Sequence, residues 1–211
     1  MNTLPPILHQ DSHVVVFDKP SGLLSVPGIG PEKADCMASR AAAAVEGARI
    51  VHRLDRDTSG VILMARDADS HRELSRQFHD REVVKHYQAI VVGRILGEEG
   101  VVDAPMRKDI ERPPRHLVDP INGKSARTGW RVLERMDDPE RTRLSFNPET
   151  GRSHQLRVHA LQLGHAILGD DLYAPRDVVA MSERLLLHAE SLAFTHPASG
   201  ERMEIRADVP F

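Results

Sequence analysis

The chain has 211 residues, of which 40% are hydrophobic and 28% charged, so it can form a sizeable buried core. No apolar run approaches the roughly 18 residues that span a bilayer, and the first residues show no signal-peptide pattern. The single cysteine, Cys36, excludes an internal disulfide and is typical of a reducing compartment. We therefore expect a cytoplasmic, monomeric globular protein with no membrane association. Because the formal net charge is only -3, a nucleic-acid partner would need a local basic surface.

In the first half of the chain, apolar runs alternate with turns and helix-capping patterns. The pattern predicts strands over residues 14–17, 61–65 and 83–92. Asp35 is the expected N-cap of a helix that ends at Val45. Ser70 and Glu73 have the spacing of a capping box and predict the start of a second helix.

The second half continues the same mixture of elements. Residues 107–120 hold three prolines and several basic side chains, which predicts an exposed loop. Strands are predicted over residues 128–136 and 142–146, a helix from the cap Ser153 to Gly164, and a hairpin from 192–195 and 203–207. Because no regular βαβ alternation is present, we expect an α+β fold with a mixed, largely antiparallel central sheet flanked by helices and loops. We expect one domain over residues 1–211, with its core at about 13–208.

Reactive side chains gather in three stretches. HRLD at 52–55 places Asp55 beside arginines and just ahead of a predicted buried strand. KHY at 85–87 places Tyr87 in a strand, where its ring can pack while its hydroxyl reaches a site. TGRSHQLRVH at 150–159 places Arg157 one turn into a helix, where its guanidinium can form a two-pronged ion pair with a carboxylate.

Each stretch also has a purely structural interpretation. Asp55 and Arg157 can belong to ordinary ion pairs, and strand aromatics such as Tyr87 usually lie in the core. The basic residues of 107–120 can be solvated surface charge. We expect no metal site, because His154 and His159 are five residues apart and face different sides of a helix.

Taken together, the three stretches resemble the motifs of the RluA family of RNA pseudouridine synthases. HRLD followed by TSG at 58–60 is similar to the family's catalytic-aspartate signature, and K-x-Y-x-A at 85–89 to its tyrosine motif. The 150–159 stretch, followed by Gly169-Asp170 and Tyr173, is similar to its arginine motif. DKPSGL at 18–23 and LHA at 187–189 also match. The chain departs from the family at Ala166, where a proline is common. It has no room before its first strand for the S4-type domain of many relatives, so it most resembles the short RluA subgroup.

The resemblance implies an isomerase that converts uridine to pseudouridine in structured RNA, with no cofactor. The implied substrates are the tRNA anticodon stem-loop (uridine 32), 23S rRNA (uridine 746), or both. Asp55 would act at the sugar, Tyr87 would stack on the uracil and assist removal of the C5 proton, and Arg157 would orient Asp55 and keep it ionised. Arg53 would insert into the RNA when the target uridine flips out. The other expected RNA-site residues are His52, Arg56, Arg152, His154, Lys108, Arg112 and Arg115.

Two other classes of function stay open at this level. An RNA-binding protein without catalysis would bind RNA and release no product, although the presence of Asp55, Tyr87 and Arg157 argues against it. A metal-dependent hydrolase built on the His-Arg-x-Asp cluster would be inactivated by a chelator. An isomerase of this type would not be, unless its RNA needs divalent ions to fold.

Overall fold

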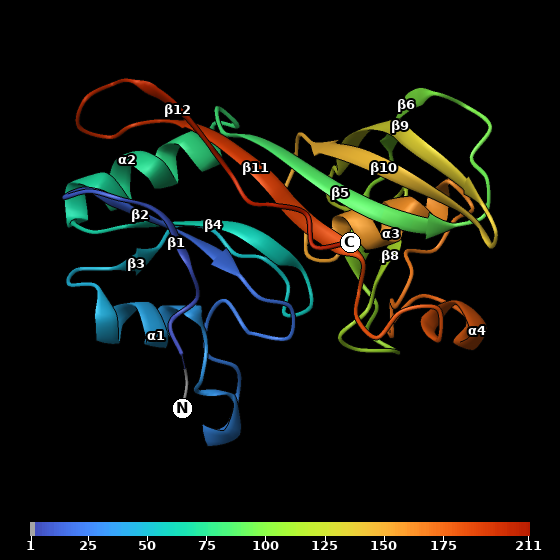
Figure 1. Ribbon diagram of the computed structural model, residues 1–211, viewed down its shortest axis with the longest axis horizontal. Coiled ribbons are helices and arrows are strands. Elements are labelled where there is room, and N and C mark those ends of the chain that lie inside the picture. The colour runs from blue at the N-terminus through green and yellow to red at the C-terminus, as the bar shows by residue number, and fades with distance from the viewer. Residues whose placement is uncertain (1–2) are drawn as a thin grey trace. The chain divides into compact units, whose positions relative to one another are not determined.

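A computed structural model describes residues 3–211, which divide into two compact units (Figure 1). Unit 1 comprises the chain up to residue 85 together with residues 188–210, and unit 2 comprises residues 86–187 together with Phe211. The chain leaves unit 1 within strand β5 (Val84–Val92) and returns to it at the start of β11 (Leu187–Thr195). The expected α+β fold with a mixed, largely antiparallel sheet is confirmed.

Unit 1 is built around one fully buried strand, β4. The strands of unit 1 are β1 (Ile7–Gln10), β2 (Val14–Lys19), β3 (Arg49–Ile50), β4 (Ser59–Ala65), β11 and β12 (Arg202–Arg206). Strand β2 lies antiparallel to β4, and β11 is parallel to it, with His188 opposite Ser59. Strands β11 and β12 form the expected C-terminal hairpin. The uninterrupted apolar sequence of β4 reflects its burial on both faces.

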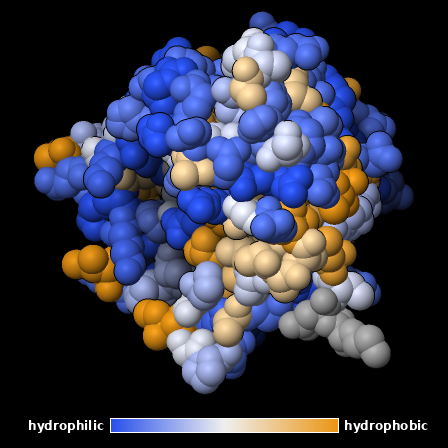
Figure 2. Space-filling model, turned by 90° about the vertical axis from the view of Figure 1, so that its left-hand side faces the viewer, coloured by the Kyte–Doolittle hydropathy of each residue, from blue (hydrophilic) through white to orange (hydrophobic). Residues whose placement is uncertain are grey.

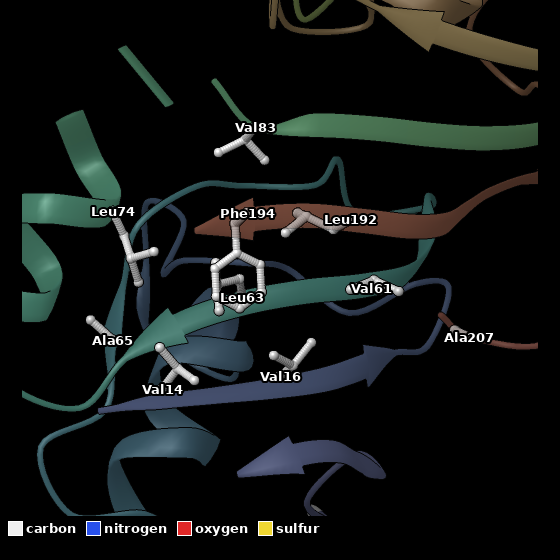
Figure 3. Close-up of a cluster of buried hydrophobic side chains, with 10 residues drawn as sticks. All are labelled: Val14, Val16, Val61, Leu63, Ala65, Leu74, Val83, Leu192, Phe194 and Ala207. Atoms are coloured by element: carbon white, nitrogen blue, oxygen red, sulfur yellow. The ribbon is translucent and has the colours of Figure 1, made fainter. Parts of the chain in front are cut away.

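Alternate residues of these strands form the core of unit 1. Figure 3 shows Val16 of β2, Leu63 of β4 and Phe194 of β11 directed into one cluster, together with Leu74 of helix α2 (Ala68–His79). Residues two apart in a strand share a face, which is why every second apolar residue belongs to this cluster. Figure 1 shows α2 and helix α1 (Met37–Ala44) on opposite sides of β2 and β4. The ends of this rigid layer carry the loops described below.

Unit 2 contains a second group of antiparallel strands in the order β5-β10-β9-β6. Strands β6 (Glu99–Asp103), β9 (Arg127–Asp137) and β10 (Glu140–Pro148) join β5. Helix α3 (Gln155–Gln162) packs Leu156 and Ala160 against Leu144 and Phe146 of β10. The short helices are η1 (Pro31–Lys33) in unit 1 and α4 (Arg176–Val179) in unit 2.

The predicted helix starts were wrong in all three cases. Helix α1 is capped by Cys36 and not by Asp35, whose carboxylate accepts two hydrogen bonds from Arg40 at 2.8 and 2.6 Å. Helix α2 is capped by Asp67, one turn ahead of the predicted capping box. Helix α3 begins after His154, which adopts a left-handed conformation (φ 58°) and makes no side-chain cap, so Ser153 is not its N-cap. For α1 and α2 another polar residue nearby supplies the cap, and α3 has no side-chain cap.

The prediction of a plain loop over residues 107–120 was also wrong. Strands β7 (Met106–Lys108) and β8 (His116–Val118) pair there as a small antiparallel sheet. The turns that follow these strands are held by Asp109 and Asp119, each of which accepts hydrogen bonds from two backbone amides further along the chain. The prolines of this stretch lie in these turns and not in the strands, so they do not interrupt the pairing.

No helix within residues 3–211 is long and apolar enough to cross a membrane. The face of the molecule seen in Figure 2 is mostly hydrophilic, with a smaller apolar area.

Candidate active site

Asp55 lies in the loop 51–58 between β3 and β4, and its side chain is half-buried. Its backbone carbonyl accepts a hydrogen bond from the Thr58 amide at 3.2 Å, so the chain turns directly after it. On its other side, the buried Leu54 is fixed by Ser25, whose hydroxyl donates to the Leu54 carbonyl at 2.6 Å and accepts from the Leu54 amide at 3.1 Å. The carboxylate is thus carried by backbone that is anchored on both sides.

A buried ammonium group provides the strongest of these anchors. Lys19 is fully buried at the end of β2, and its Nζ donates to the carbonyls of Pro20, Leu23 and Arg56 at 2.9, 2.8 and 2.9 Å. The Ser21 hydroxyl adds a bond to the Asp57 carbonyl at 2.7 Å. A buried charge needs hydrogen-bond partners, and these carbonyls come from the turn 20–24 and from the Asp55 turn, so Lys19 joins the two turns. Sequence reasoning missed this role, although the DKPSGL match pointed to the segment.

The far end of the loop is fixed by a close approach between β4 and β11. Gly60 has φ +110°, and a Cβ there would lie 2.2 Å from the Ala189 carbonyl oxygen, so only glycine fits. Beside it, Ser59 Oγ and His188 Nδ1 are 2.8 Å apart. The TSG and LHA segments noted in the sequence therefore meet as paired strands in unit 1.

The residues flanking Asp55 differ in exposure. Arg53 and Arg56 are exposed, and Arg56 forms a two-pronged ion pair with Asp57 at 2.9 and 3.1 Å. His52 instead faces inward, where its Nε2 accepts from the Leu63 amide at 2.9 Å and its ring stacks on Phe78. Burial, with a smaller contribution from the charge of Lys85, lowers the pKa of His52 to about 3. His52 is therefore neutral and supports the loop by a hydrogen bond.

In unit 2, Tyr87 lies on β5 opposite Phe146 of β10 and packs, half-buried, against the core that contains Leu144. The ring is thus held by the sheet, which agrees with the structural interpretation of a strand aromatic.

Arg157 is 2% exposed and forms the expected two-pronged ion pair. Its Nε donates to Asp170 Oδ2 at 2.8 Å, its Nη2 donates to Asp170 Oδ1, and Asp171 Oδ1 accepts from Nη2 at 3.2 Å. Asp170 also accepts from the amides of Leu172 and Tyr173 at 3.1 and 3.0 Å. The sequence offered Gly169-Asp170 as part of the arginine motif, but only the structure identifies Asp170 as a partner of Arg157.

Tyr173 connects this ion pair to the small β7–β8 sheet. Its hydroxyl accepts from the His116 amide at 2.7 Å and lies 2.7 Å from His154 Nδ1. The guanidinium groups of Arg157 and Arg115 lie over its ring, 5.2 and 5.1 Å from the centroid. Burial raises the pKa of the phenol, so Tyr173 is protonated at neutral pH. Two expected RNA-site residues, His154 and Arg115, thus meet at a tyrosine that sequence reasoning had given no role.

The other expected RNA-site residues of unit 2 lie at its surface. Lys108 and Arg152 are exposed, and Arg112 is exposed while paired with Asp109 at 3.0 Å. His159, by contrast, is buried, and its ring nitrogens lie 2.9 Å from Thr128 Oγ1 and 3.3 Å from the Ala104 carbonyl oxygen. Within residues 3–211, no group of three His, Cys, Asp or Glu side chains is placed to hold a metal ion.

The fold is that of pseudouridylate synthase domains. The solved structure of human RNA pseudouridylate synthase domain containing 1 is similar to it with a TM-score of 0.82 and 26% sequence identity, covering 98% of this chain and 84% of the human one. The sequence profile of the RNA pseudouridylate synthase family matches residues 13–162. The dual-specificity RNA pseudouridine synthases RluA of Yersinia pestis and Haemophilus influenzae are 47% and 48% identical over 205 residues. These matches cover 97% of this chain and 99% and 93% of the two relatives. The chain belongs to the RNA pseudouridylate synthase family, which confirms the resemblance seen in the motifs.

Proposed function

We propose that this protein isomerises uridine to pseudouridine in the tRNA anticodon stem-loop, in 23S rRNA, or in both. The observation that carries the proposal is the placement of Asp55, the aspartate of the family signature. It is half-buried on a loop fixed by Lys19 and Ser25. A rigidly held carboxylate suits catalysis at a sugar carbon, because the reacting atoms must be aligned within a fraction of an ångström. The match to RluA proteins over nearly their whole length supports the choice of substrates.

The reaction breaks the N1–C1′ bond, turns the uracil, joins C5 to C1′ and removes the C5 proton. It needs no redox change and no outside reagent. Asp55 acts at the anomeric carbon, where a carboxylate can attack or stabilise developing positive charge. Two routes fit this role: an adduct between Asp55 and the sugar, and a glycal intermediate whose formation Asp55 promotes.

Tyr87 stacks on the uracil and takes part in removal of the C5 proton. An unperturbed phenol titrates near pH 10 and is a poor base, so stacking is its main contribution. Arg157 orients the Asp55 carboxylate, which stays a prediction. The two-pronged ion pair with Asp170 fixes the plane of the Arg157 guanidinium.

Basic side chains hold the RNA, and the target base flips out of the stack. Extrusion of a stacked uridine costs a few kcal/mol, and the exposed Arg53, two residues before Asp55, fills the vacated position. The further RNA contacts are Arg56, Arg152, Lys108, Arg112 and Arg115, while His52 and His154 support the site through hydrogen bonds. The protein works as a monomeric catalytic domain in the cytoplasm. The family match runs through both compact units and so supports a single catalytic module.

Separate transcripts of tRNA and 23S rRNA, each with tritium at uracil C5, test the function and its substrates. Release of tritium to water by the wild type, and none by Asp55→Asn, is the expected result on at least one RNA. Release from only one of the two would restrict the substrate, and release from neither would refute the proposal. Binding of both RNAs without release would favour an RNA-binding protein, whereas loss of activity with a chelator on metal-independent RNA would favour a hydrolase.

A further inference from the structure

A hollow of about 530 Å³ lies in unit 1 beside the turn that carries Asp55. Its walls are the turn 20–24, the short helix η1, the residues Asp35 and Arg40 at the start of α1, and Arg56. We propose that this hollow binds a second nucleotide of the RNA substrate, adjacent to the target uridine, with its phosphate on Lys33. The inference rests on the proposed function.

Three cations line the hollow, and among residues 3–211 Lys33 is the one that pairs with no carboxylate, whereas Arg56 is paired but exposed and is also expected to contact RNA. Arg40 is engaged by Asp35 at 2.6 Å, and Arg56 by Asp57 at 2.9 Å. Lys33 has no carboxylate within ion-pair distance among residues 3–211. Glu32 also lines the hollow, so the site is not uniformly positive. One free ammonium beside a carboxylate suits a single bridging phosphate better than a multiply charged free anion.

The stem of Lys33 is held in place by a glycine. The Gly28 amide donates to the Lys33 carbonyl at 3.0 Å, and the Lys33 amide donates to the Gly30 carbonyl at 3.1 Å. A Cβ on Gly28 would lie 2.9 Å from both Cβ and Cδ of Lys33, so the aliphatic stem lies directly over the bare glycine. The first methylenes of Lys33 are thus packed against the loop, while the residue as a whole is exposed.

The floor of the hollow is physically joined to the Asp55 turn. The Gly22 amide donates to the Arg56 carbonyl at 2.9 Å, and the Ser21 hydroxyl donates to the Asp57 carbonyl at 2.7 Å. Arg56 follows Asp55 in the chain and is a wall of the hollow, so a nucleotide bound in the hollow would lie beside the Asp55 turn. The side chains of Pro20 and Leu24 offer that nucleotide an aliphatic surface for its base.

The test measures the binding of a fluorescent anticodon stem-loop hairpin and a fluorescent 23S rRNA hairpin by anisotropy at several salt concentrations. Removal of one phosphate contact lowers the slope of log affinity against log salt by about 0.7–0.9. For Lys33→Ala, the loss of affinity between about 50 and 200 mM salt should therefore be about threefold smaller than for the wild type. Lys33→Arg should restore the slope. Arg72→Ala is the matched control, because Arg72 is 76% exposed on α2, outside the hollow, and should keep the wild-type slope.

A wild-type slope in Lys33→Ala would overturn the proposal. Binding of millimolar uridine monophosphate to the wild type but not to Lys33→Ala, with unchanged RNA slopes, would assign the hollow to free nucleotides and also overturn it. Tritium release measured on the same RNAs separates the two hypotheses. If the wild type releases tritium and Lys33→Ala keeps the wild-type salt slope, only the second nucleotide site is refuted. If Lys33→Ala lowers the salt slope but the wild type releases no tritium, the site is supported and the isomerase activity is refuted.

Discussion

Replacement of Lys19 by methionine should both destabilise unit 1 and slow turnover. Methionine has nearly the length of lysine and fills the same buried space, but it cannot donate a hydrogen bond. The substitution therefore leaves three carbonyls, those of Pro20, Leu23 and Arg56, without the ammonium that now binds them at 2.8–2.9 Å.

The expected cost follows from these three bonds. Each buried acceptor left without its partner costs about 1–3 kcal/mol. The Leu23 bond is fully buried, whereas the Pro20 and Arg56 bonds are partly accessible, so water can replace some of what is lost. Methionine also removes the cost of burying a charge, which offsets part of the loss. A net destabilisation of about 3 kcal/mol results, or a fall in Tm of about 6–12 °C for a protein of this size.

Urea unfolding and thermal melts measure the stability, and tritium release at a temperature where the variant is folded measures turnover. The turnover rate should fall more than tenfold, because the Arg56 carbonyl fixes the residue next to Asp55 and small displacements of a catalytic group are costly. Lys33→Met is the control for stability, since Lys33 is exposed. If Lys19→Met unfolds within about 0.5 kcal/mol of the wild type and turns over at the same rate, the proposed anchoring of the Asp55 turn is incorrect.

Three further predictions concern other residues of the site. Asp170→Asn should destabilise the protein by about 3–5 kcal/mol, because it leaves the Arg157 guanidinium buried without its main counter-charge, and a thermal melt within a degree of the wild type would contradict this. His52 has a pKa of about 3 in the folded protein, so the unfolded chain takes up its proton first and stability falls as the pH drops from about 6.5 toward 3. His52→Gln should flatten the pH dependence of unfolding in that range, whereas His79→Gln, at an exposed histidine, should leave it steep. Arg53→Ala should reduce turnover on folded RNA more than on a short unstructured oligonucleotide, and equal losses would contradict its role in base flipping.

The sequence predicts well those elements whose burial is visible in their own order of apolar and polar residues. The apolar run 61–65 is a strand buried on both faces, as its uninterrupted apolar sequence predicts. The strands β7 and β8 were not predictable in this way. Each has three residues, and their pairing is supported by the Tyr173 hydroxyl, which binds the His116 amide from 57 positions away.

The residues of the site show the same difference between local sequence patterns and long-range contacts. Asp55, Tyr87 and Arg157 were selected from motifs, because reactive side chains and their spacing are visible in the sequence. Lys19 was not, because its partners are backbone carbonyls, one of them 37 residues away, and carbonyls leave no signature in a sequence. The pairing of Asp170 with Arg157 was not predicted either, because it depends on how the chain returns after α3.

The most direct test of the catalytic role of Asp55 is the release of C5 tritium from uridine-labelled RNA by variants of a single carboxylate. Asp55→Asn keeps the size of the side chain and removes its charge, so the release of tritium should fall to background. Asp69→Asn makes the same change at an 86% exposed position on α2 and should release tritium at the wild-type rate. Release by Asp55→Asn at a rate near that of Asp69→Asn, with pseudouridine found in the digested RNA, would contradict the assignment of Asp55 as the catalytic residue.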